Sequence, residues 1–220
     1  MVGLAADDGV IIWTGHGARP FARAIVDDVV PGRAPLSLAG IATEFRTIAE
    51  RFSDVVSFVG IAQVAKGPSP TRWSIGECLV HLTLASEAYL PVWREACNRA
   101  RAEGVTGHEP FKLDLWGRFW VWFLKPPPKI RFPAPKRFVP TEIPPGHDVL
   151  RAFLASQEQV LSTIDWAQGL AIDRVKITSA IDRRVRYSVW SSFCANASHQ
   201  HRHLWQAEHV AEQIGKFAHS

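Results

Sequence analysis

The chain has 220 residues, and 47% of them are hydrophobic, including nine tryptophans. This is enough apolar surface for a folded core and excludes a chain that is disordered throughout, and the length favours one domain with an appendage over two domains. The formal net charge of +4 is only mildly basic, and no run of lysine and arginine alternates with aromatics, so a nucleic-acid-binding protein is not indicated.

Residues 1–35 differ in composition from the rest of the chain. They mix glycine, proline and small residues, and we predict a poorly ordered extension in which Phe21–Val30 could form one short helix. Asp7 and Asp8 stand where a secretory signal would carry positive charge, so we expect no signal peptide. The domain proper is predicted to span residues 36–216.

The first secure helix is indicated by seven apolar residues spaced by three and four. This is the pattern of a helix packed in a bundle. A glycine and two prolines between residues 66 and 70 are predicted to stop the helix. The seven residues are Leu38, Ile41, Phe45, Ile48, Phe52, Val55 and Val59.

A second helix is predicted to begin after Ser74 and to end near Gly104. Ser74 and Glu77 have the spacing of a capping box, in which each side chain satisfies a free backbone amide near the other. Because Pro91 lies inside the helical pattern, we expect a kink or an irregular turn there.

Residues 105–147 interrupt the helical pattern. The aromatic stretch Leu115–Leu124 is predicted to be partly helical. The Pro-rich segment that follows it is predicted to be extended, since proline cannot continue a helix. A connection this long should carry the chain over the body of the domain and not between neighbouring helix ends.

Two more helices complete the predicted fold. One runs from about Asp148 to Trp166, and the other covers Ser188–Ile214 with Ser188 as its N-cap. Residues 170–187 between them are predicted to be loop with room for one short strand. Four amphipathic helices with one long crossing connection predict an all-α fold, a four-helix up-and-down bundle with a long Pro-rich connection between helices 2 and 3.

The last helix carries an apolar stripe and a second stripe of neutral polar groups. The second stripe holds no Lys, Glu or Arg, unlike an ordinary solvated face. His199 and His203 are one turn apart and can place two imidazole nitrogens on one metal ion, which is the sharpest chemical signal in the chain. The apolar stripe is Trp190, Phe193, Ala197, Leu204 and Ala211; the second stripe is Ser192, Asn196, His199, His203 and Gln206, followed by the apolar Val210.

Two histidines do not make a metal site, and a third ligand has to come from another helix. Gln200 follows His199, so the HExxH motif of zinc proteases is absent. His81, in the predicted second helix, is the natural candidate. Periodicity alone favours a simpler interpretation, in which His81 lies on the flank of a packed face.

Three neighbours of these histidines have interpretations of their own. His201 falls in the apolar stripe and is predicted to be a packing histidine. Cys78 lies one turn before His81 and is predicted to be a buried, inert thiol. Gln206 lies one turn after His203 and is either a hydrogen-bond partner of a ligand or a solvated amide.

The aromatic stretch Leu115–Leu124 also admits two interpretations. Three basic residues follow it between 125 and 131, which would suit a lid or an interfacial contact with a membrane. The interpretation we favour is that Trp116, Trp120 and Trp122 cover the open end of the bundle, because the segment is short and its charges are clustered at one end. No apolar run approaches about 18 residues, so we expect no transmembrane segment.

Three pieces of the sequence together resemble the DinB/YfiT-like superfamily, in particular its DinB-like domain. They are RWSIGECLVHL at Arg72–Leu82, FLKPPPKIRFPAPKRFVP at 123–140 and HQHRHLWQAEHV at His199–Val210. Their order and the HxxxHxxQ spacing make the match specific. The resemblance covers about residues 36–215 and leaves the N-terminal extension outside.

The resemblance implies an up-and-down four-helix bundle, often dimeric, that holds a divalent metal between its helices. The family takes one histidine from the second helix and two from the fourth, and the matching positions are His81, His199 and His203. Gln206 matches the glutamine that follows the last ligand, and with Asn196 it would orient ligands or substrate. The ligand set would suit Zn²⁺, Ni²⁺ or Mn²⁺.

The resemblance also implies a class of reaction. Characterised relatives resemble transferases and isomerases that use a low-molecular-weight thiol such as mycothiol or bacillithiol, which the metal presents as thiolate. Three neutral histidines with an open position would equally suit metal-bound water and hydrolysis. The leading hypothesis is therefore a metal-dependent enzyme that acts on a small molecule, either a thiol-dependent S-transferase or isomerase or a hydrolase.

The alternative hypothesis is a non-catalytic bundle that binds a small ligand or a partner protein and keeps a vestigial metal site. The apolar stripe of the last helix could serve a homodimer or the core. The three cysteines, Cys78, Cys97 and Cys194, lie far apart without a CxxC motif, which fits reduced thiols and a cytoplasmic protein better than a disulfide framework.

Overall fold

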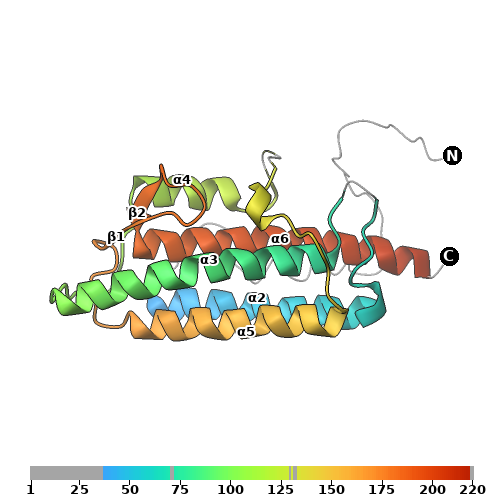
Figure 1. The fold of residues 1–220 in the computed structure, drawn as a ribbon, viewed down its shortest axis with the longest axis horizontal. Coiled ribbons are helices and arrows are strands. Elements are labelled where there is room, and N and C mark those ends of the chain that lie inside the picture. The colour runs from blue at the N-terminus through green and yellow to red at the C-terminus, as the bar shows by residue number, and fades with distance from the viewer. Residues whose placement is uncertain (1–36, 70–71, 129, 131–132, 219–220) are drawn as a thin grey trace, which may run out of the picture.

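The computed structural model describes residues 37–218, except for 70–71, 129 and 131–132. The predicted N-terminal extension, residues 1–35, lies outside the described residues. The described residues are mainly helical, with five α-helices and a small two-stranded sheet, which confirms the predicted all-α class (Figure 1). None of the described helices is long and apolar enough to cross a membrane.

The elements follow the predicted order along the chain. Two short 3-10 helices, η1 (Ile61–Gln63) and η2 (Lys136–Phe138), lie in the connections. The longer elements are α2 (Leu38–Val59), α3 (Ile75–Ala102), α4 (Leu115–Leu124), α5 (Gly146–Trp166), β1 (Lys176–Thr178), β2 (Arg186–Ser188) and α6 (Val189–Ala218).

Local sequence signals fix several helix ends. The Ser74 hydroxyl accepts the backbone N–H of Glu77, and the Glu77 carboxylate accepts the backbone N–H of Ser74, so the predicted capping box is formed. The Ser188 hydroxyl accepts the backbone N–H of Ser191 at 3.1 Å, as expected of the N-cap of α6. Helix α3 continues through Pro91, so of the two expectations for this position the irregular turn is not formed, and the kink stays a prediction.

The structure corrects three predictions about the secondary structure. Helix α2 ends at Val59 and not at the prolines near residue 68, because Gly60 takes a positive φ of 79° that stops the helix. The region 170–187 holds one strand and the start of a second, since β1 pairs antiparallel with β2 and Ile177 lies opposite Tyr187. The Pro-rich segment, predicted to be extended throughout, contains the 3-10 helix η2.

The four long helices α2, α3, α5 and α6 pack side by side (Figure 1). Helices α3 and α5 begin at the same end of the molecule, where Gly76 and Gly146 both lie close to Val64. They therefore run parallel, and the strict alternation of an up-and-down bundle is not kept between them. The reason is the connection over residues 103–145, in which α4 and the Pro-rich segment bring the chain back along the bundle before α5 begins.

Polar contacts join α2 to α6 beside the apolar core. His201 Nε2 lies 2.6 Å from a carboxylate oxygen of Glu44, so His201 is a hydrogen-bonding residue and not the packing histidine that its place in the apolar stripe predicted. Arg51 and the buried Glu208 form an ion pair at 2.5 Å between the same two helices.

Helix α4 lies along α6 and does not cover the end of the bundle. Its inner side is formed by Gly117, Val121 and Leu124, which are buried. Trp120 packs partly against the core, but Trp116 and Trp122 are exposed, so the prediction that all three tryptophans cover the bundle was wrong. The helix could turn these rings outward because its smaller side chains already fill the contact with α6.

Gly117 allows the close approach of α4 to α6. A Cβ atom at this position would overlap the side chain of Ser191 at the start of α6. We expect Gly117→Ala to lower the free energy of unfolding by about 1–3 kcal/mol, because the crowded contact forces the helices apart. Urea denaturation would measure this change. The exposed Arg118→Ala on the same helix should stay within about 0.5 kcal/mol of the parent, and equal effects of both substitutions would contradict the close contact.

Candidate metal centre

Three histidines from α3 and α6 lie together, although His81 is far from the other two in sequence. The Nε2 atom of His199 is 3.1 Å from Nε2 of His81 and 3.1 Å from Nε2 of His203. One nitrogen from each ring lies within 4.8 Å of the others, so this group could hold a metal ion. These are the three histidines that the sequence singled out.

The backbone of α6 and the start of α3 bring the rings together. His199 and His203 are one turn apart and face the same neighbour. The capping box at Ser74 fixes the start of α3, and His81 lies about two turns into this helix on the side that faces α6. The sequence therefore encodes two of the three histidines locally and leaves the position of the third to helix packing.

The tautomer of His81 follows from its hydrogen bond to the Pro-rich connection. Its Nδ1 atom lies 2.8 Å from the carbonyl oxygen of Phe138 in η2. A carbonyl can only accept, so Nδ1 carries the proton and the lone pair of a neutral ring lies on Nε2, which faces His199. Such a hydrogen bond is the usual support of a metal-binding histidine.

Burial keeps the three imidazoles neutral. It lowers the pKa of His81, lowers that of His199 to about 3 and lowers that of His203 well below the ordinary value. Neighbouring histidines and the guanidinium of Arg202 lower the pKa of His199 and His203 further. Neutral rings keep the lone pairs that a metal ion needs.

An aromatic ring covers one side of the cluster. Trp73 stacks on His203 with ring centroids 5.7 Å apart and an angle of 20°, and its centroid is 5.0 Å from that of His81. Trp73 directly precedes the N-cap Ser74, so the start of α3 also positions this ring. Sequence reasoning missed Trp73, although its place beside the capping box was a usable signal.

Comparison with known proteins agrees with this geometry. A family model described as the DinB superfamily matches residues 44–207, which include all three histidines and Gln206. The chain belongs to the DinB superfamily. No curated protein and no solved structure matches it.

Two further residues of this DinB-superfamily chain were expected beside the ligands. Gln206 lies near enough to His203 to favour its protonated form, but the contact does not reach hydrogen-bond geometry. Asn196 is buried and accepts a hydrogen bond at 3.2 Å from the side chain of Gln200, which also donates to Ser86 at 3.3 Å. The structure thus ties Asn196 to Gln200, a residue that sequence reasoning missed.

One polar atom of the histidine cluster and one of the residue that follows His199 are buried without a hydrogen-bond partner among the described residues. They are Nδ1 of His203 and Oε1 of Gln200. Buried polar atoms are rarely left without a partner, and a bound ion, water or ligand is a common reason for such an exception. Nδ1 of His203 points away from the three converging Nε2 atoms, so a partner at this atom would support the ring from behind and would not be a ligand of an ion in the cluster.

Within the described part of the chain, no thiol or carboxylate group belongs to the histidine cluster of His81, His199 and His203. Cys78 is buried, and burial raises its pKa well above the ordinary value, as expected for an inert thiol. No carboxylate of the described residues belongs to the three-histidine group. The donor set is therefore purely imidazole, which suits Zn²⁺ or Ni²⁺ better than Mg²⁺ or Ca²⁺.

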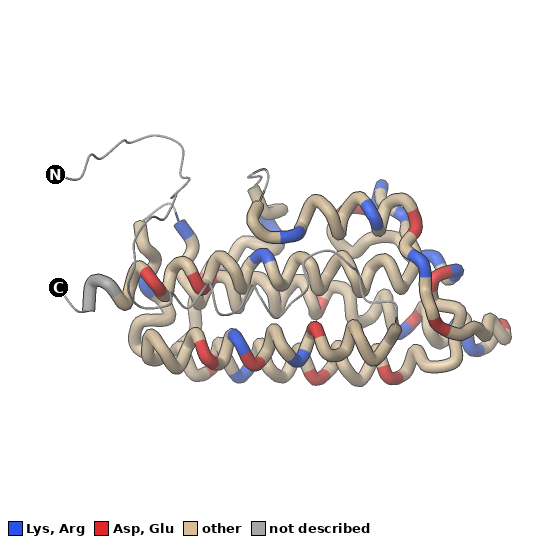
Figure 2. Tube along the Cα trace, turned by 180° about the vertical axis from the view of Figure 1, so that it is seen from behind, with Lys and Arg blue, Asp and Glu red and all other residues tan. Residues whose placement is uncertain are grey.

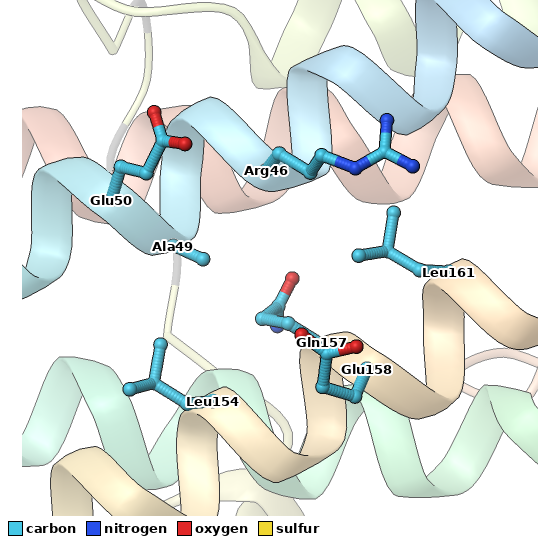
Figure 3. A pocket seen from close by; sticks show the side chains of 7 residues that line it. All are labelled: Arg46, Ala49, Glu50, Leu154, Gln157, Glu158 and Leu161. Atoms are coloured by element: carbon cyan, nitrogen blue, oxygen red, sulfur yellow. The ribbon is translucent and has the colours of Figure 1, made fainter.

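A separate cavity of about 360 Å³ lies between α2 and α5 (Figure 3). Arg46 and Glu50 of α2 and Gln157 and Glu158 of α5 are among the residues that line it. None of the three histidines lines this cavity, so it is distinct from the histidine cluster.

The lowered pKa values predict that the metal-free protein loses stability in acid. The unfolded chain binds protons on its histidines below about pH 6.5, whereas the native cluster resists them, so the free energy of unfolding falls as the pH drops below that value. Because His199→Gln removes one such group, we expect this variant to lose about 1 kcal/mol less than the parent between pH 7.5 and pH 5.5. Urea denaturation of metal-free protein at both pH values would measure the difference.

His147, an exposed residue of α5, supplies the control for this experiment. The variant His147→Gln should follow the pH dependence of the parent. If His199→Gln also follows the parent, the cluster does not resist protonation and the buried neutral triad is wrong.

Proposed function

We propose that His81, His199 and His203 bind one divalent metal ion and that this chain is a metal-dependent enzyme. The observation that carries the proposal is the pair of 3.1 Å separations between the Nε2 atoms. Ligands about 2.0–2.1 Å from a tetrahedral ion are separated by about 3.3 Å, which is close to the spacing seen here. The ion would be Zn²⁺, Ni²⁺ or Mn²⁺.

The residues around the cluster have distinct parts in this proposal. The carbonyl of Phe138 holds the proton of His81 on Nδ1 and so keeps Nε2 available. Trp73 limits the access of water on one side of the rings. Gln206 and Asn196 would orient ligands or substrate, the first through His203 and the second through Gln200.

The charge of the site favours an anionic ligand. The three imidazoles are neutral, so they leave the double charge of the ion uncompensated, and the half-buried guanidinium of Arg202 adds to the positive potential. When bound, such an ion lowers the pKa of a thiol or a water molecule that it coordinates. A thiolate or a hydroxide would be held more firmly than a neutral ligand.

The thiol in this proposal comes from outside the chain. Cys78 and Cys194 are buried with raised pKa values, and burial also raises the pKa of Cys97 to about 11. None of them suits a nucleophile, whereas a low-molecular-weight thiol could reach an open coordination position. We therefore propose a thiol-dependent S-transferase or isomerase that acts on a small molecule, with metal-assisted hydrolysis as the second candidate, since water could occupy the same position.

We propose, further, that residues 36–216 form one DinB-like domain whose core is the four-helix bundle of α2, α3, α5 and α6. Three free, buried cysteines support a place in the cytoplasm, where thiols stay reduced. The homodimer expected from the family stays a prediction that light scattering can check.

Metal content tests the proposed site directly. We expect untagged protein to hold about one metal ion per chain, and the variants His81→Ala and His203→Ala to lose most of it, because two imidazoles bind an ion far more weakly than three. Elemental analysis of gel-filtered protein would measure the stoichiometry, and circular dichroism would show that the variants stay helical.

The exposed His147→Ala is the matched control and should keep the metal content of the parent. Full metal content in His203→Ala would rule out the triad. A parent without metal, even after reconstitution, would favour the alternative function, a non-catalytic bundle that binds a small ligand or partner protein with a vestigial site.

A cobalt-substituted protein distinguishes thiol from water. If the site accepts an exogenous thiol, a low-molecular-weight thiol should add a sulfur-to-cobalt charge-transfer band in the near ultraviolet, because a thiolate enters the coordination sphere. Titration of the absorption spectrum with the thiol, and with the matching alcohol as control, would measure this. An unchanged spectrum at millimolar thiol would leave hydrolysis as the preferred reaction.

A further inference from the structure

Helix α4 exposes a continuous row of large apolar side chains, which we call the aromatic face. Leu115 is 81% exposed, Trp116 46%, Phe119 42% and Trp122 54%. The opposite side of this helix already packs on α6 through Gly117 and Val121. Helix α4 is therefore apolar on two sides, and only one of them serves the core.

Exposed apolar side chains concentrate in this part of the molecule. Of nine large hydrophobic residues exposed in the described chain, six lie between Leu115 and Val139, and four of these belong to α4. Single exposed hydrophobics are common, but a group of this size on one short helix marks an interaction surface.

Positive charge accompanies the aromatic face. Residues 112–140 contain seven basic residues and one acidic residue, a net charge of +6, whereas the whole chain has +4, so the remainder carries a net charge of −2. The exposed basic residues of this segment include Lys112, Arg118, Lys136 and Arg137. Figure 2 shows Lys and Arg along α4 and the segments beside it, whereas Asp and Glu are spread over the long helices.

The acidic residue of the segment does not offset this charge at the surface. Asp114 accepts hydrogen bonds from the backbone of Gly117 and Ser188, at 2.8 and 2.6 Å, and pairs with Lys176 at 2.6 Å. Its carboxylate is thus committed to holding the start of α4 in place, and the exposed Arg118 of the same helix is not paired with it.

We propose that the aromatic face docks on an anionic lipid bilayer. Interfacial segments of membrane-associated proteins combine tryptophan and phenylalanine with lysine and arginine. Their rings enter the headgroup region, and their cations pair with lipid phosphates. The attachment that we propose is peripheral, because it uses one exposed side of α4 while the other side stays packed on α6. A second copy of the chain is a poorer occupant, because a symmetric contact would bring two segments of charge +6 together.

The same surface continues toward the histidine cluster. Ile130 and Val139 of the Pro-rich connection are 59% and 39% exposed. The carbonyl of Ile130 accepts a hydrogen bond from Arg202 at 2.7 Å. The carbonyl of Phe138, the residue before Val139, accepts a hydrogen bond from Nδ1 of His81. Docking would therefore turn the segment that covers the histidines toward the bilayer.

Vesicle co-sedimentation of the full-length protein tests the proposal. We expect binding to phosphatidylcholine vesicles that contain about 30% phosphatidylserine, weaker binding to pure phosphatidylcholine, and release when the salt rises from about 0.05 M to about 0.5 M. Absence of binding to the anionic vesicles at low salt would overturn the proposal.

Two matched pairs of variants locate the contact. The double variant Trp116→Ser, Phe119→Ser should weaken vesicle binding about ten-fold or more. The control Ile61→Ser changes an exposed apolar residue of η1, outside the aromatic face, and should leave vesicle binding unchanged. Arg118→Glu should weaken binding to anionic vesicles, whereas Lys66→Glu should have a smaller effect. Thermal unfolding would confirm that each variant is folded.

Light scattering on the same samples separates the bilayer from a protein partner. A dimer in the parent that becomes a monomer in the Trp116→Ser, Phe119→Ser variant would assign the face to a second copy and overturn the bilayer. Equal loss of vesicle binding in the Trp116→Ser, Phe119→Ser variant and in the Ile61→Ser control would also contradict docking through the aromatic face. None of these outcomes depends on metal binding, so the two proposals fail separately.

Discussion

The apolar core is interrupted halfway along the helices, and the candidate site depends on this interruption. One apolar cluster contains Phe45, Trp93 and Phe193, and the other contains Phe52, Phe153 and Leu204. Along α3, α5 and α6 the residues between them are polar and buried, among them Ser86, Gln157 and Gln200. Burying such groups costs free energy unless they are hydrogen-bonded, so a polar layer in a core normally has a task beyond stability. Here the layer borders the three histidines.

The long connection between α3 and α5 completes the site. It runs back along the bundle, so that α3 and α5 are parallel, and this path places η2 above His81. The Phe138 carbonyl then sets the tautomer of His81, and the Ile130 carbonyl accepts a hydrogen bond from Arg202, the neighbour of His203. The part of this connection that contains the short 3-10 helix η2 thus orients side chains on α3 and α6 through two backbone carbonyls.

The sequence predicts features that depend on residues within a turn or two of each other. It does not predict features that depend on how the helices pack. The capping box at Ser74, the spacing of the α2 apolar residues and the pair His199–His203 all depend on neighbours within a turn or two, and each was found from the sequence. His81 could be joined to the pair only through the family resemblance, because its partners lie on another helix. The role of Phe138 is a property of a backbone carbonyl, which has no signature in the residue type. The outward tryptophans of α4 were missed because periodicity identifies an apolar side but not which of two apolar sides meets the core.

The composition of the histidine cluster favours the proposed catalytic role over a structural metal site. Structural metal sites in proteins are usually closed by four protein ligands, whereas the described residues supply three imidazoles and no carboxylate or thiolate. The two apolar clusters on either side of the polar layer are complete without an ion, since their largest members, such as Trp93, Phe52 and Phe153, are fully buried. Three neutral donors, a fixed tautomer and a positive potential from Arg202 are instead the conditions under which an ion can take an additional anionic ligand.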